Sequence, residues 1–449
     1  MKEQAGKFTI DTIITVITRA LQLGLSLVIS IIIARVLGPE GQGIYSLAIF
    51  LPSLLINFGN FGFGQASVFY VGRQRYPVEE IFGNNIILSF LLGIITFLVG
   101  LGIIIFFGNY LFPKVAKIYL FLALFLIPLR FFLSFINYLL LGLQRIKEFN
   151  FINILQSFVF LTLLSVVLLV FKFAVKATIV ANILACLIGA IVLFYLAKKI
   201  VGNFYLSFNK FYLKEAFQYG FKVYLGNVIG FLHYRIDIFL INILLNPMAV
   251  GFYSIATALA EKIWFVSQSA GIVLFPRVST ETNERNLKEF TPIVCRNVLL
   301  ITLVSAILLF CLGRSVVVLF YSEKFLDSVL PFQILLMGTV TMSGWRILAN
   351  DLYGRGKPEL NIYVSLASVL LNIILNILWI PRHGIVGAAW ATSISYVFAF
   401  IIIMVIYSKI SRNSIEKVMF LRKSDIIVYY DFIVSFKERI KAYVTGINL

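Results

Sequence analysis

The sequence predicts an all-α, polytopic membrane protein with about twelve transmembrane helices. Apolar residues make up 60% of the chain and charged residues 13%, whereas a soluble domain is roughly 45–50% apolar and 25% charged. The apolar residues recur in blocks of about twenty, and each block is long enough to cross about 30 Å of hydrocarbon. Because these blocks are continuous and do not alternate with polar residues, they indicate helices and exclude the strands of a membrane barrel.

The apolar blocks give the expected spans. In chain order they cover residues 9–34, 45–69, 80–107, 116–142, 151–171, 178–196, 216–244, 251–274, 293–313, 331–353, 361–379 and 388–407. The first block is too long for the apolar part of a signal peptide and contains Asp11 and Arg19, so we expect it to be retained as a helix.

The basic residues orient these spans. With the N-terminus in the cytoplasm, the connections and tails on that side contain 23 Lys and Arg residues, and the opposite connections contain eight. The positive-inside rule therefore predicts a cytoplasmic-membrane protein with both termini in the cytoplasm and a basic cytoplasmic or interfacial tail at 411–449. The net charge of +18 is then an insertion signal and a contact with anionic membrane lipids, and it does not indicate a nucleic-acid surface.

A short motif occurs twice. Leu37 to Ala48 and Leu245 to Ala256 share Leu, Pro, Gly, Tyr, Ser and Ala in the same register, and Gly142 to Arg145 is echoed by Gly354 to Lys357. Two matches predict a duplication into six-helix lobes at 1–200 and 201–410. Six is an even number, so we expect parallel lobes related by an axis along the membrane normal, with a site between them.

These motifs resemble those of a transporter family. The segment from Ala34 to Tyr45, its second copy and the turns after Gly142 and Gly354 are similar to the oligosaccharide flippases of the polysaccharide transport family. That family belongs to the superfamily of multidrug, oligosaccharidyl-lipid and polysaccharide (MOP) exporters, which includes the multidrug and toxin extruders (MATE) and the lipid II flippases. The resemblance covers roughly residues 5–410. It implies two lobes forming a V that opens alternately to each side, and a polyprenyl-diphosphate-linked oligosaccharide as substrate for cell-surface polysaccharide biosynthesis.

Basic residues inside the spans suggest where that substrate binds. A charge in mid-membrane costs about 2.5–3.5 kcal/mol on insertion scales, so each needs a reason. A guanidinium matches phosphate oxygens in a bidentate manner, so a cationic cavity would suit a diphosphate or sugar head group. The candidates for this cavity are Arg19, Arg130, Arg235 and Arg346.

Four other titratable residues are candidates for ion coupling or charge pairing: Asp11, His233, Asp237 and Glu261. His233 and Asp237 are four apart and share a helix face. Asp237 resembles an intramembrane Asp of many family members, and it could neutralise an Arg or couple transport to a proton or sodium ion. For His233 and Glu261 a structural role is equally open. Four charged residues lie within about two turns of a span end, where snorkelling would explain the long basic side chains: Lys222, Arg296, Arg346 and Asp351.

The sequence argues against enzymatic activity. It has no GxxxxGK[ST] phosphate loop, and its two histidines, His233 and His383, are far apart, so neither a nucleotide-driven pump nor a catalytic metal is expected. The longest outer connection, 314–330, is too short for a catalytic domain. No cofactor is expected apart from a coupling proton or sodium ion. Expected partners are the lipid-linked oligosaccharide, membrane lipids and a polysaccharide polymerase or glycosyltransferases.

Two other functions stay open at this point. One is a MATE-like antiporter of drugs or metabolites, which acidic residues in the first lobe would favour, but Asp11 is the only acid expected to be buried there. The other is a non-transporting scaffold or lipid scramblase within a glycan-assembly complex.

Overall fold

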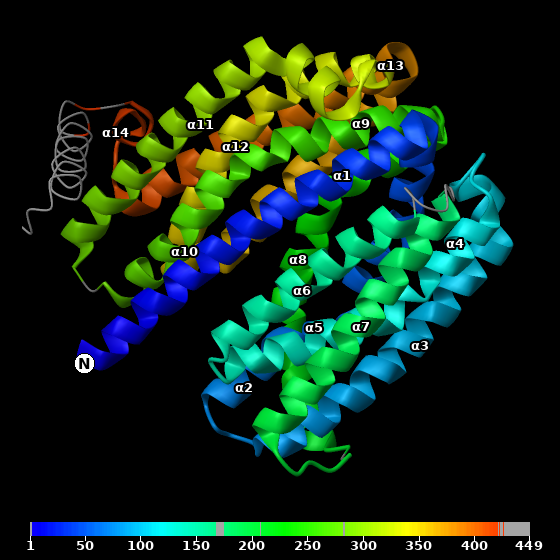
Figure 1. Ribbon diagram of the computed structural model, residues 1–449. Helices are drawn as coiled ribbons and strands as arrows, with labels where there is room; N and C mark the ends of the chain where they lie inside the picture. The colour runs from blue at the N-terminus through cyan, green and yellow to red at the C-terminus, as the bar shows by residue number, and fades with distance from the viewer. Residues whose placement is uncertain are drawn as a thin grey trace, which may run out of the picture. The chain divides into compact units, whose positions relative to one another are not determined.

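A computed structural model describes residues 2–167, 175–206, 208–281 and 283–420, together with Arg422 and Asp425. Every regular element in these ranges is a helix (Figure 1). Ten helical stretches within them are long and apolar enough to cross a membrane. The chain is therefore an all-α, polytopic membrane protein, as the sequence predicts.

Two of these ten stretches are unusually long. Helices α1 (Lys2–Gly59) and α13 (Pro358–Ser411) are each interrupted by one glycine in the left-handed region, Gly38 at φ 68° and Gly384 at φ 58°. The helix that contains Gly384 has 54 residues, about 80 Å at 1.5 Å per residue, which exceeds twice the thickness of a hydrocarbon core. Each interruption marks a point where the chain can turn back. A total of twelve spans stays a prediction.

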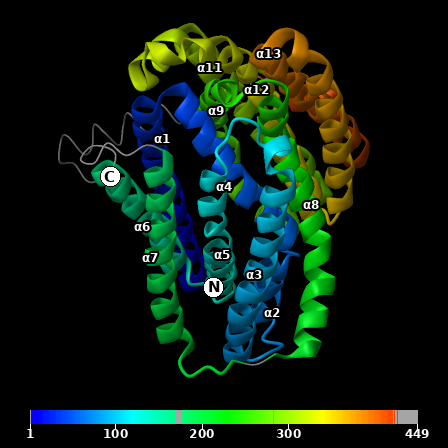
Figure 2. The same cartoon turned by 90° about the vertical axis from the view of Figure 1, so that its right-hand side faces the viewer.

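Contacts divide the chain into two compact units. The first comprises Met1–Ala260, Leu312–Leu335 and Val369–Thr392. Its complete helices are α1, α2 (Phe63–Gly72), α3 (Val78–Leu111), α4 (Lys117–Leu124), α5 (Leu126–Gly142), α6 (Ile146–Ser165), α7 (Val175–Val201), α8 (Lys210–Leu244) and α9 (Pro247–Ala260). Helices α3, α5, α6 and α7 run alongside one another (Figure 2). Large side chains such as Phe82, Phe131 and Phe135 are fully buried between the helices of this unit.

The second unit comprises Glu261–Cys311, Leu336–Ser368 and Ser393–Leu449. It contains α10 (Trp264–Thr280) and α14 (Ile415–Met419), most of α11 (Glu284–Tyr321) and α12 (Val329–Gly354), and the ends of α13. Its core gathers buried side chains from these helices, among them Cys295, Leu348, Ile403 and Val418. The lobe boundaries 1–200 and 201–410 stay a prediction, and residues 421, 423–424 and 426–449 of the expected tail lie outside the described residues.

The two motif copies meet inside the first unit, where α1 and α9 lie side by side (Figure 1). A Cβ atom added at Gly43 would collide with the carbonyl oxygen of Pro247, and one added at Gly251 would collide with that of Pro39. These four residues are two pairs of equivalent positions, so the contact is reciprocal. Glycine is required at both crossing points because the backbones touch.

Candidate functional site

Arg130 lies in a cavity of about 400 Å³ in the first unit. The cavity is open on one side and is lined by one face each of α5, α6 and α7, with Ile29 of α1. The other lining residues are Leu133, Gln156, Ser157, Phe160, Asn182, Ala185 and Cys186. Their spacing of three or four positions within each helix is what brings them to a common surface. The structure thus places one of the four predicted arginines in a polar pocket.

The hydrogen bonds around Arg130 involve only neutral groups. Its Nη1 donates to Ser53 Oγ at 3.1 Å, and no carboxylate among the described residues forms an ion pair with it. Across the cavity, Asn182 Nδ2 donates to Tyr45 Oη at 3.0 Å. The Nε2 of Gln156 is buried and has no acceptor in the described protein. The cavity therefore presents donors without a matching anion.

A second polar cluster surrounds Asp237, whose side chain is 3% exposed. Tyr253 Oη donates to Asp237 Oδ2 at 2.6 Å, and Thr392 Oγ1 lies 3.4 Å from the same oxygen. Asn372 Nδ2 donates to Thr392 Oγ1 at 3.3 Å, and Asn376 Nδ2 to Asn372 Oδ1 at 3.0 Å. Asn376 Oδ1 is buried without a partner. Helices α8, α9 and α13 thus converge on one carboxylate and several neutral oxygens.

The repeat relates these two sites. Tyr45 and Tyr253 are equivalent in the two motif copies. Tyr45 accepts a hydrogen bond from Asn182, and Tyr253 donates one to Asp237. The site of the first tyrosine contains the cationic Arg130, and that of the second contains the anionic Asp237. Sequence reasoning missed the neutral members of both clusters. The amides Asn372 and Asn376, four apart in a span, were the available signal.

The other predicted substrate ligands lie elsewhere. Arg19 of α1 and Arg235 of α8 do not line the Arg130 cavity, and Arg235 Nη1 donates to the carbonyl of Tyr234 at 2.9 Å. In the second unit, the guanidinium carbon of Arg346 lies 4.3 Å from the ring centroid of Trp264, a cation–π contact. These three arginines stay predictions as substrate ligands.

The remaining candidates have separate surroundings. His233 is 2% exposed and its ring stacks on Tyr234 at 5.8 Å. Glu261 opens a short 3₁₀ segment, Glu261–Ile263, in the second unit. The side chain of Asp11 lies outside the described residues. Within the described chain, no three His, Cys, Asp or Glu side chains gather to hold a metal ion.

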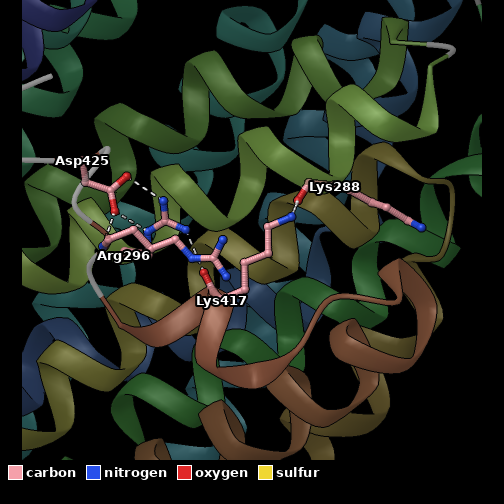
Figure 3. A network of polar contacts seen from close by, with 5 residues as sticks. Lys288, Arg296, Lys417 and Asp425 are labelled. Atoms are coloured by element: carbon pink, nitrogen blue, oxygen red, sulfur yellow. Dashed lines mark hydrogen bonds and ion pairs between the residues drawn. The ribbon is translucent and has the colours of Figure 1, made fainter. Parts of the chain in front are cut away.

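Arg296 of α11 forms a buried ion pair (Figure 3). Its Nε and Nη2 donate to Asp425 at 2.7 and 2.6 Å, and both side chains are 2% exposed. Its Nη1 donates to the carbonyl of Lys417 at 2.8 Å, while Lys417 Nζ donates to the carbonyl of Lys288 at 2.9 Å. Arg296 is therefore paired internally, in contrast to the snorkelling side chain that its position suggests.

Asp351 also forms an ion pair, although it lies near the end of a predicted span. Its Oδ1 accepts a hydrogen bond from Arg355 Nε one turn later. Its Oδ2 accepts from Thr291 Oγ1 at 2.6 Å, which ties α12 to α11. Arg296 and Asp351 thus both have structural partners.

Comparisons with known proteins place the chain in a family. Residues 32–330 match the family described as polysaccharide biosynthesis protein. A probable low-salt glycan biosynthesis flippase, Agl15 of Haloferax volcanii, is 25% identical over 41% of this chain and 39% of that protein. A putative O-antigen transporter of Shigella flexneri is 22% identical over 84% of this chain and 92% of that one. The chain spans less than half the length of the archaeal relatives it matches.

The fold also has a solved counterpart. The lipid II flippase MurJ, in an inward closed conformation, superimposes with a TM-score of 0.73 at 16% identity, covering 95% of this chain and 93% of that one. At that identity the similarity concerns the fold alone, and it agrees with the all-α membrane architecture. The family match covers two thirds of the sequence and includes both motif copies, Asp237 and every lining residue of the Arg130 cavity except Ile29. The chain belongs to the polysaccharide biosynthesis protein family.

Proposed function

We propose that this protein is a flippase that translocates a polyprenyl-diphosphate-linked oligosaccharide across the cytoplasmic membrane for cell-surface polysaccharide biosynthesis. The observation that carries the proposal is Arg130, a cation without a carboxylate partner among the described residues, inside a polar cavity of a helical membrane bundle. The names of the relatives, a glycan biosynthesis flippase and an O-antigen transporter, support the same class of cargo.

The positive charge in the cavity favours this anionic cargo over cationic drugs. Of the described residues, Arg130 is the one charged side chain that lines it, and its positive charge would repel a cationic drug. A MATE-like drug antiporter is therefore the weaker hypothesis. Transport proceeds by alternating access of the lobes 1–200 and 201–410, with no catalytic step. Both termini face the cytoplasm, where glycosyltransferases or a polymerase would meet the protein.

The Asp237 cluster is suited to energise transport. Its carboxylate, amide and hydroxyl oxygens are the hard ligands that a small cation prefers, and the buried Asn376 Oδ1 has unused acceptor capacity. Alternatively, Asp237 takes up a proton, with Tyr253 and Thr392 at hydrogen-bond distance from the carboxylate. Both couplings use the same carboxylate, and imposed sodium and pH gradients would distinguish them.

Reconstitution tests the function directly. The purified full-length protein is placed in liposomes with a fluorescent polyprenyl-diphosphate oligosaccharide, and an impermeant quencher reports the fraction that reaches the outer leaflet. We expect translocation above protein-free vesicles that accelerates under an imposed ion gradient. Equal translocation rates with and without protein would support a scaffold. A protein-dependent rate that is the same with and without imposed ion gradients would support a scramblase. Uptake of a cationic dye without lipid translocation would support the antiporter.

A further inference from the structure

We propose that the Arg130 cavity is a specificity subsite that binds one carboxylate-bearing sugar residue, of the uronic acid type, in the transported glycan. This inference rests on the proposed flippase function and specifies which part of the substrate the cavity takes. It differs from the general expectation that intramembrane arginines hold the diphosphate of the carrier lipid.

Charge matching selects the carboxylate. Among the described residues, Arg130 is the only charged one that lines the cavity. A guanidinium pairs with one carboxylate through two parallel hydrogen bonds and neutralises its single charge. A diphosphate carries at least two negative charges, so a single arginine would neutralise only part of its charge. Ser53 accepts a hydrogen bond from one of the five guanidinium N–H groups of Arg130, so other N–H groups are available for a ligand.

The neutral lining matches the rest of a sugar ring. A ring has hydroxyls around its edge and C–H groups on its faces, so it needs polar groups beside an apolar wall. Gln156 supplies a buried Nε2 that lacks an acceptor, and Asn182 and Ser157 add an amide and a hydroxyl. Phe160 and Leu133 form an apolar part of the wall of the same cavity. A sugar hydroxyl would find amide and hydroxyl partners on these lining side chains.

Gly189 creates the space that this arrangement requires. A Cβ atom at this position would lie 2.6 Å from Gln156 Cγ, so the glycine lets Gln156 lie against α7 at the cavity wall. The volume of about 400 Å³ is near the lower end of the roughly 300–1,000 Å³ typical of small-molecule sites. The cavity therefore takes one or two sugar rings, and the remaining glycan and the carrier lipid lie outside it.

Binding to the purified protein in lipid nanodiscs tests the inference. The probes are methyl glucuronoside, the matched neutral methyl glucoside and inorganic pyrophosphate, measured by calorimetry. We expect methyl glucuronoside to bind at least 10-fold more tightly than methyl glucoside, since hydrogen bonds to charged groups contribute about 1.5–3 kcal/mol. Arg130→Gln should remove that preference, and the exposed Arg382→Gln is the matched control that keeps it. Equal affinity for the two glycosides, or displacement of the glucuronoside by pyrophosphate, would overturn the proposal.

A second variant and a transport measurement complete the test. If Arg130→Gln does not fold, Gln156→Leu removes the neutral donor and should weaken both glycosides by about 3- to 10-fold; unchanged binding contradicts the proposed pocket. In liposomes, the wild type should translocate a uronic-acid-containing lipid-linked glycan faster than its neutral counterpart. Equal rates for the two lipids overturn the subsite while the flippase function stands. Translocation of neither lipid overturns the flippase function itself.

Discussion

Ser46 donates a hydrogen bond to Ser254, with 3.3 Å between the hydroxyl oxygens, and the two serines occupy the same position of two sequence repeats. The contact extends to the glycines three residues earlier, Gly43 and Gly251, which lie against the opposite motif's proline carbonyls. Equivalent residues that contact each other define a local two-fold relationship. The two copies of the motif therefore contact each other through equivalent residues.

The reciprocal glycine contact predicts that the stability of the fold falls sharply when a side chain is added at either glycine. Gly43→Ala should lower the free energy of unfolding by about 1–3 kcal/mol, because its Cβ would overlap a backbone carbonyl that cannot rotate away. Gly24→Ala in the same helix is the control, since a Cβ there meets nothing within 4 Å. Thermal unfolding of the purified variants measures the difference. Equal unfolding temperatures for the two variants would contradict the close packing.

The serine pair offers a covalent probe of the same contact. In a background without Cys186, Cys295 and Cys311, the double variant Ser46→Cys/Ser254→Cys should form a disulfide on mild oxidation, because its thiols replace hydroxyls that touch. If α1 and α9 separate during transport, the oxidised protein should lose translocation and regain it on reduction. Mass spectrometry measures the cross-link, and either single cysteine variant is the control. Full activity of the cross-linked protein would show that this contact does not open.

Removal of Asp425 should destabilise the second unit. Asp425→Asn would leave the Arg296 guanidinium, which is 2% exposed, without its counter-charge, and breaking a buried pair costs about 3 kcal/mol. We expect lower thermal stability and faster proteolysis after Lys417. Lys409→Gln, an exposed basic residue on the last turn of α13, is the control. Wild-type stability in Asp425→Asn would mean that the pair contributes nothing net.

The same pair predicts a pH dependence. Burial opposes ionisation of Asp425, but hydrogen bonds from Arg296 and from the Arg422 backbone N–H outweigh it and hold the pKa of Asp425 below its usual value. A carboxyl with a depressed pKa stabilises the fold above the unfolded-state pKa of about 3.9, and this contribution is lost as the pH falls through the folded-state pKa. The stability difference between wild type and Asp425→Asn should therefore be constant above pH ~5 and shrink below pH ~4. Unfolding midpoints across this range measure it.

Asp237 should control the energetics of transport. Asp237→Asn keeps the volume of the side chain but removes its charge, so the variant should lose acceleration by sodium or pH gradients while it retains a basal rate. Asp327→Asn, an exposed acid in the 3₁₀ segment Glu323–Ser328, is the control. The measurement is the initial translocation rate with each gradient imposed separately. An unchanged gradient response would assign the coupling to another group.

The sequence alone determined the class of the molecule. Continuous apolar blocks require helices, because a backbone in lipid must satisfy its own hydrogen bonds. The motif containing Pro39 and Pro247 predicted a duplication, and intramembrane charge pointed to Arg130 and Asp237 as residues that need an explanation. These signals are local: composition, period and charge are properties of a segment and do not depend on what packs against it.

The tertiary structure alone decided which residues meet. Periodicity identifies a helix face but not the helix that covers it, so the neighbours of Arg130, such as Gln156 and Asn182, became visible only once α5, α6 and α7 were packed. For the same reason, Arg19 and Arg235 looked equivalent to Arg130 in sequence, although they do not line its cavity. Asp425 is 129 residues from Arg296, and only the path of the chain after α13 brings it to that guanidinium. Neutral donors and distant partners carry no sequence signature, because their role arises from desolvation and contact in the folded state.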